Sequence, residues 1–84
     1  MKHGRISELT KERAELHKTE REIADAEHRV GHQALLVEKL RSGGRETGKA
    51  ELLLASMREL TSLLHEHRKL ILQQIARLET RTIP

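Results

Sequence analysis

The chain has 84 residues, enough for one small domain, and only 36% of them are hydrophobic. It contains no cysteine, which excludes disulfides and thiolate metal sites, and with no Phe, Trp or Tyr its core must be built from aliphatic side chains and Met. The net charge of +3, from 16 basic and 13 acidic side chains, is weaker than the basic stripe typical of nucleic-acid-binding proteins.

Apolar residues occur only in short runs, of which the longest is LLLA at positions 52–55. A membrane-spanning helix needs roughly 20 such residues. The opening stretch, MKHGRISELTKER, has no apolar segment behind its charges, which is unlike a secretory signal. Together with the lack of cysteine, these features predict a cytoplasmic protein without membrane contact.

The first half of the chain has the pattern of one long helix. Apolar residues recur every seven positions, at Leu9, Leu16, Ile23, Val30 and Val37. A seven-residue repeat marks a helix with one buried seam. No proline interrupts this stretch, and we predict a helix over residues 7–42.

A glycine-rich stretch follows, and we predict a turn over residues 43–47. Gly44 suits the left-handed conformation that ends many helices. Thr47 suits the N-cap of a second helix, where its hydroxyl would accept a hydrogen bond from a free backbone N–H.

The same stretch matches most of a phosphate-binding loop, G-x-x-x-x-G-K-[ST]. Ala50 stands where the magnesium-binding hydroxyl should be, and a long polar helix pattern precedes the loop instead of a strand. We therefore interpret it as a turn without a nucleotide. Arg45 and Lys49, beside the start of the second helix, could still hold an anion weakly.

The second half repeats the heptad pattern and predicts a helix over residues 48–80. Its seam residues are Ala50, Met57, Leu64, Ile71 and Leu78, with Leu53 and Leu60 interleaved. Because the connection is short, the helices should be antiparallel neighbours. Facing residues would then have numbers that sum to 90, as for Val37 with Leu53 and Ala26 with Leu64. The predicted fold is all-α, an antiparallel two-helix coiled-coil hairpin forming a single domain over residues 1–84.

Polar residues also fall on the predicted seam. His67 opposes Ile23 and should be buried, Glu12 should face Leu78, and Thr19 and Gln74 also lie on the seam. Such residues usually fix the register of a coiled coil at some cost in stability. We expect this role for them, with fraying toward the open end of the hairpin.

Four apolar residues of the second helix fall outside this predicted seam: Leu54, Leu63, Leu70 and Ile75. A wide apolar face indicates a bundle of more than two helices. We therefore expect a homodimer in which two hairpins pair as a four-helix bundle through these four residues.

Residues 23–75 resemble a group of short uncharacterised proteins of alphaproteobacteria. The matching pieces are His32–Gln33, the turn Gly44–Arg45–Glu46–Thr47, Leu53–Leu54 and His67–Arg68. The group often has Asp where Glu46 stands here. This resemblance implies a helical hairpin of bacterial origin and carries no known activity.

The histidines are the candidate metal ligands. His28 and His32 are four residues apart and share a helix face, as a metal-binding pair would. The predicted register brings His65 opposite Asp25, one turn from His28. All of these lie outside the seam, so we interpret them as surface residues and expect neither a metal nor another cofactor.

The sequence favours a non-enzymatic function. With no Cys or Tyr and no visible Ser-His-acid arrangement, it offers no candidate nucleophile, and a two-helix rod lacks the concave pocket that enzymes use. We predict a self-associating structural or protein-interaction module, whose partner the sequence does not identify. The alternative is a helical-hairpin dimer that binds RNA or DNA, disfavoured because basic and acidic residues alternate and aromatic rings for stacking are missing.

Overall fold

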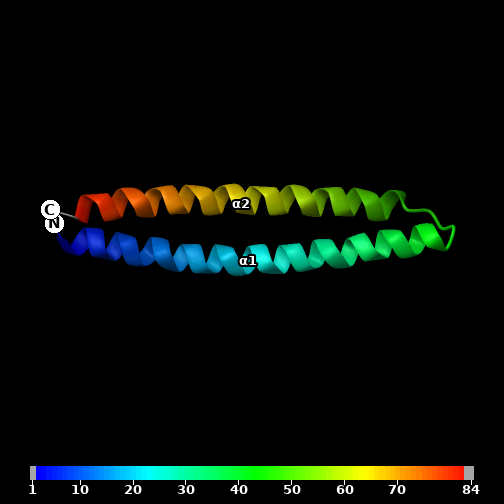
Figure 1. Cartoon of the computed structure of the whole chain (residues 1–84), viewed down its shortest axis with the longest axis horizontal. Helices are drawn as coiled ribbons and strands as arrows, with labels where there is room; N and C mark the ends of the chain where they lie inside the picture. The colour runs from blue at the N-terminus through cyan, green and yellow to red at the C-terminus, as the bar shows by residue number, and fades with distance from the viewer. Residues whose placement is uncertain (1, 83–84) are drawn as a thin grey trace.

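The computed structural model describes residues 2–82 and consists of two helices packed side by side in opposite directions (Figure 1). Helix α1 spans Lys2–Ser42 and helix α2 spans Gly48–Thr82. The rod measures 65 × 14 × 14 Å. The all-helical hairpin predicted from the heptads is thus confirmed, although α1 begins before the expected residue 7. No helix within residues 2–82 has a stretch long and apolar enough to cross a membrane.

The end of α1 is a Schellman motif built on Gly44. Its φ is +68°, the left-handed conformation predicted for it. The Gly44 N–H donates to the carbonyl of Arg41 over 3.0 Å, and the Arg45 N–H donates to the carbonyl of Leu40 over 2.8 Å. These two bonds satisfy carbonyls that the helix end would otherwise leave free.

Thr47 occupies the N-cap of α2, since its carbonyl accepts the first helical bond from the Glu51 N–H over 2.8 Å. The Thr47 hydroxyl donates to the Glu51 carboxylate over 2.7 Å, a different contact from the backbone bond expected of it. The same carboxylate accepts a hydrogen bond from Arg41 over 3.0 Å. Side chains of both helices therefore stabilise the turn through the Glu51 carboxylate.

The seam of α1 contains the residues that the heptad predicted. Leu9, Ile23 and Val37 are buried, and the positions between them are buried or half-buried: Glu12, Leu16, Thr19, Ala26, Val30 and Gln33. The buried side of α1 therefore follows the seven-residue repeat over nearly its whole length.

The seam of α2 differs from the prediction at every second position, which turns the buried face of the helix by about 50°. Ala50, Met57, Leu64, Ile71 and Leu78 lie at the seam as expected. The positions between them are Leu54, Thr61, Arg68 and Ile75, instead of Leu53, Leu60, His67 and Gln74. Leu54 and Ile75 are only 7% and 8% exposed, so their predicted place outside the seam is wrong. The predicted burial of His67 is also wrong, because its side chain is 49% exposed.

The side chains themselves account for the rotation. Both registers bury a leucine near the turn, because Leu53 and Leu54 are adjacent. Toward the open end, the observed register buries Ile75 where the predicted one would have centred Gln74. In the middle, Thr61 satisfies its own hydroxyl by donating to the Met57 carbonyl over 2.8 Å, and Arg68 reaches out of the seam to Glu20 over 3.2 Å.

The tightest packing lies at the open end of the hairpin, where fraying was expected. Leu9, Ile71, Ile75 and Leu78 form a buried cluster, with Leu16 packed against it. Leu78 is only 1% exposed. That expectation is therefore wrong for the described residues, because burying Ile75 supplies the aliphatic packing that the predicted seam lacked there.

Two polar seam residues of α1 have contrasting surroundings. Gln33 donates from Nε2 to the carbonyl of Ala50 over 3.0 Å, which ties α1 to the first turn of α2. Thr19 is fully buried, and its hydroxyl has no hydrogen-bond partner. A buried polar atom without a partner costs stability, so Thr19 is a weak point of the seam.

Candidate interaction surface

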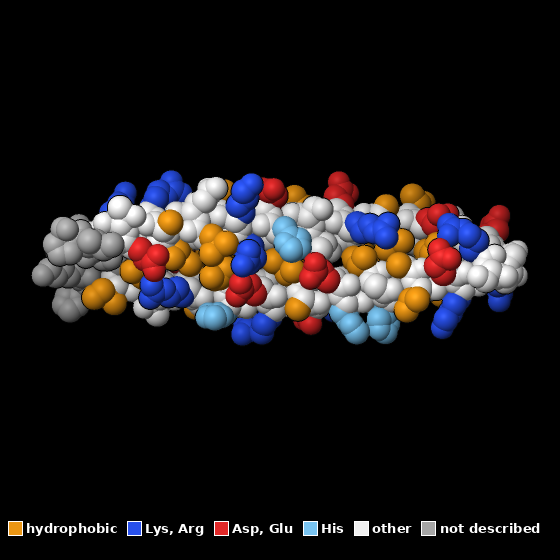
Figure 2. All heavy atoms as spheres, viewed as in Figure 1, with side chains coloured by type: hydrophobic (Ala, Val, Ile, Leu, Met, Phe, Trp, Pro, Cys, Tyr) orange, Lys and Arg blue, Asp and Glu red, His pale blue; other side chains and the backbone are white. Residues whose placement is uncertain are grey.

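The two edges of the seam, where α1 and α2 meet the solvent, differ in chemistry. One edge is lined by polar contacts between the helices. Ion pairs join Arg13 to Glu79, Glu20 to Arg68 and Arg41 to Glu51, and His65 Nε2 lies 3.4 Å from a carboxylate oxygen of Glu27. The α1 members are spaced by multiples of seven residues and therefore share one face. Figure 2 shows acidic and basic side chains facing each other along such a boundary between the helices. We call this side the ion-paired edge.

The nitrogen-to-oxygen distances along the ion-paired edge range from 2.8 Å at Arg13–Glu79 to 3.4 Å at Glu27–His65. The side chains involved are 41–59% exposed. Pairs this exposed contribute little to stability because water screens them. Their main consequence is that this edge presents charge of both signs, although Leu72, at 38% exposed, lies on it between His65 and Glu79.

The other edge carries leucines that the hairpin does not bury. Leu53, Leu60, Leu63 and Leu70 of α2 are 52%, 57%, 62% and 59% exposed. Their spacings of seven, three and seven residues place them in one line along the helix. We call these four residues the leucine stripe. Ser56 and His67 complete its heptad pattern, and His67 Nε2 lies 3.5 Å from a carboxylate oxygen of Glu15 on α1.

Helix α2 therefore has two seams. The first, through Leu54 and Ile75, packs on α1, and the second is the leucine stripe. With 3.5 residues per turn, the centres of the two seams lie about 100° apart around the helix. A helix at the corner of a four-helix bundle has two neighbours at about this angle.

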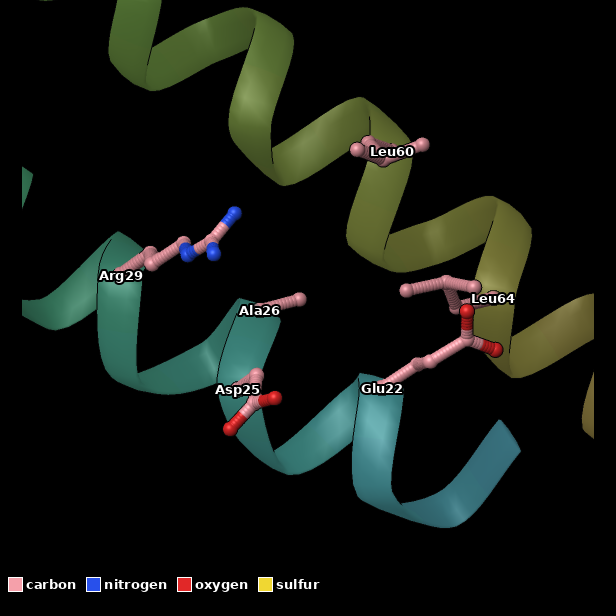
Figure 3. A pocket seen from close by; sticks show the side chains of 6 residues that line it. All are labelled: Glu22, Asp25, Ala26, Arg29, Leu60 and Leu64. Atoms are coloured by element: carbon pink, nitrogen blue, oxygen red, sulfur yellow. The ribbon is translucent and has the colours of Figure 1, made fainter. Parts of the chain in front are cut away.

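Beside the middle of the leucine stripe there is a shallow hollow between the helices (Figure 3). Ala26 of α1 is its floor, because this small seam residue leaves space against Leu60 and Leu64 of α2. Glu22 and Arg29 reach from α1 toward α2 on either side of Ala26, as Figure 3 shows. An adjoining, mostly apolar hollow is lined by Ala26, Arg29, Met57 and Leu60. The first hollow is open, and its lining combines hydrocarbon from Ala26, Leu60 and Leu64 with the charged side chains Glu22, Asp25 and Arg29.

The predicted site residues fall into separate places. Leu63 and Leu70 lie on the stripe as expected, Leu54 and Ile75 lie inside the hairpin, and Leu53 and Leu60 join the stripe. The heptad pattern predicts Leu53 and Leu60 at the contact with α1, and this prediction is wrong. The run of three consecutive leucines at 52–54 was the signal that either register was possible.

Arg45 and Lys49, the predicted weak anion site, are both exposed beside the first turn of α2. Within residues 2–82 the chain forms only helices and their connecting turn, so the phosphate-loop match at Gly43–Lys49 is a helix cap followed by a helix start. Anion binding there stays a prediction.

The histidines do not assemble into a metal centre in the described part of the chain. The rings of His28 and His32 lie with their centroids 4.5 Å apart on the surface of α1. His65 pairs instead with Glu27 on the ion-paired edge. No group of three His, Asp or Glu side chains among the described residues is placed to hold a metal ion.

Comparison with known proteins adds no relative: no protein-family model, curated protein or solved structure matches this chain. The resemblance to short alphaproteobacterial proteins therefore stays a prediction. The geometry of the hairpin is the basis on which a function can be argued.

Proposed function

We propose that this protein is a non-enzymatic interaction module whose hairpins associate in pairs through the leucine stripe. The association joins two hairpins into a four-helix bundle, which then serves as a structural element or a platform for another protein. The observation that supports this most is the position of Leu53, Leu60, Leu63 and Leu70 outside the seam on a continuous line.

The energetic reason is the apolar area that one hairpin leaves in water. Full burial of a leucine side chain stabilises by roughly 1.5–3 kcal/mol, and each stripe residue is still more than half exposed. A contiguous apolar line of this kind, on a small chain, marks an interaction site. The opposite edge carries inter-helix ion pairs, which makes it a poorer surface for apolar packing than the stripe.

Two glutamates on the stripe test this proposal. In the Leu63→Glu, Leu70→Glu variant, charged groups replace two stripe residues, and association should be lost because burying unpaired carboxylates is costly. The matched control is Ala55→Glu, Ser62→Glu, which adds the same charge at the same seven-residue spacing on an exposed face away from the stripe.

Thermal unfolding followed by circular dichroism gives the readout. For the wild-type chain and the control, Tm should rise with protein concentration, because folding and association are linked. The stripe variant should unfold at a lower Tm that does not depend on concentration. If the stripe variant and the control have the same Tm and the same dependence of Tm on protein concentration, the proposal is refuted.

A further inference from the structure

The leucine stripe has a symmetry that allows two copies to meet along it in opposite directions. From Leu53 to Leu70, its positions follow spacings of 3, 4, 3, 4 and 3 residues, through Ser56, Leu60, Leu63 and His67. This order of spacings is the same in both directions along α2. A two-fold axis perpendicular to the helix, between Leu60 and Leu63, would therefore bring each position of one copy against a position of the other.

The residues that meet across such an axis are chemically matched. Residue numbers that sum to 123 face each other, which pairs Leu60 with Leu63 and Leu53 with Leu70 of the second copy. Ser56 faces His67 by the same rule. All four stripe leucines then contact leucines, so no apolar residue of the stripe opposes a charge.

The ends of the stripe distinguish the two orientations by charge. Continuing the same spacing outward along α2 reaches Lys49 on the turn side and Gln74 and Arg77 on the other, all outside the buried core. The sum of 123 sets Lys49 against Gln74, and it places Arg77 opposite the turn that precedes α2 of the other copy. A parallel arrangement would instead set every residue against its own copy, including Lys49 against Lys49 and Arg77 against Arg77. Like charges that face each other across an interface disfavour the parallel orientation.

The two hollows beside the stripe lie at the same level along α2 as the two-fold axis. Their α2 residues are Met57, Leu60 and Leu64, which surround the position of the axis. The flank of α2 that faces α1 there is apolar, since Met57 and Leu64 are only half-buried by the hairpin. A second copy seated on the stripe would cover these side chains as well.

We infer that the occupant of the leucine stripe is a second copy of this chain, bound antiparallel along α2 with a two-fold axis between Leu60 and Leu63. This inference rests on the proposed self-association and adds its orientation and register. Within the pair, the α2 helices form the central contact and each α1 helix lies on its own α2.

Cysteine cross-linking separates the two orientations, because the chain has no cysteine of its own. Ser56→Cys and His67→Cys are made as single variants, which leaves every stripe leucine in place. In the antiparallel pair, each cysteine lies about 16 Å along the helix from its own copy, at about 1.5 Å per residue. Position 56 of one chain, however, lies directly across from position 67 of the other.

The experiment treats each single variant, and an equimolar mixture of the two after exchange, with a mild oxidant or a short bismaleimide. The expected result is a cross-linked species of twice the chain mass in the mixture and almost none in either variant alone. Each sample is first confirmed as helical by circular dichroism and as associated by sedimentation.

Strong cross-linking of each variant alone would indicate a parallel pair and overturn the inference. Associated protein that fails to cross-link in the mixture would also overturn it, by showing a different register, while the proposed self-association would stand. A chain that is monomeric by sedimentation at every concentration would overturn both.

Discussion

Leu52, Leu53 and Leu54 follow one another on α2, yet the structure predicts three different responses to the same substitution by alanine. Leu52 is 71% exposed, Leu53 is 52% exposed on the leucine stripe, and Leu54 is 7% exposed in the seam with α1. Each substitution removes the same atoms from the same turn of helix. Differences between them therefore report what surrounds each side chain.

The expected losses can be ranked from these exposures. Leu54→Ala should cost about 2–3 kcal/mol, near the low end for buried leucines because only one other helix packs against it. Leu52→Ala should change the free energy of unfolding by less than about 0.5 kcal/mol, as for most surface substitutions. Leu53→Ala should cost about 1 kcal/mol where the protein is associated, and should approach the Leu52→Ala value on dilution.

Urea unfolding followed by circular dichroism measures these losses, at two protein concentrations that differ by about a hundred-fold. The decisive comparison is between Leu53 and Leu54 in the dilute sample. If Leu53→Ala there costs as much as Leu54→Ala or more, α2 is turned as the simple heptad pattern predicted. The assignment of the leucine stripe would then be wrong.

Four further substitutions test the hairpin and its turn. Thr19→Val should stabilise the chain by about 1 kcal/mol, because it removes a buried hydroxyl that has no partner; a loss of stability in urea unfolding would show that this hydroxyl is satisfied. Gly31→Ala should stabilise by about 0.5–1 kcal/mol, since it lies inside α1 with open space for a methyl group; a lower thermal midpoint would contradict the described backbone. Gly44→Val should cost on the order of 1 kcal/mol or more, because its φ of +68° disfavours a β-branched side chain, whereas Lys49→Ala should be nearly neutral. Micromolar binding of ATP in calorimetry, abolished by Lys49→Ala, would contradict our interpretation of the turn.

Much of the hairpin could be predicted from the heptads and the turn. In α1, seam residues such as Leu9, Leu16 and Ile23 recur every seven positions and have mostly polar neighbours, so only one face of this part of the helix can be buried. Gly44 could be assigned to the left-handed position because it is the residue type that adopts this conformation without strain. These features are local, and local patterns are sufficient to predict them.

The rotation of α2 could not be predicted from its own pattern. This helix has leucines on several faces, and the choice between Leu53 and Leu54 depends on what lies opposite and on distant positions of the same seam. Burial of Ile75 in the cluster with Leu9 and the reach of Arg68 to Glu20 are long-range contacts. A heptad pattern ranks Leu60 above Thr61 as a buried residue because leucine is more hydrophobic. It does not take into account that the Thr61 hydroxyl can donate a hydrogen bond to the Met57 carbonyl within the helix.

The same excess of leucines connects the fold to the proposed function. A helix that needed only one seam would not need Leu60, Leu63 and Leu70 on another face. In the single hairpin these side chains remain in water, and burying them is the driving force that we propose for association.

Sedimentation equilibrium of the wild-type chain across a hundred-fold dilution measures self-association itself. We expect a mass of two 9.7 kDa chains at high concentration, which falls toward that of one chain as the protein is diluted. A protein that stays at 9.7 kDa throughout, while remaining fully helical and unfolding cooperatively, would contradict self-association through the leucine stripe.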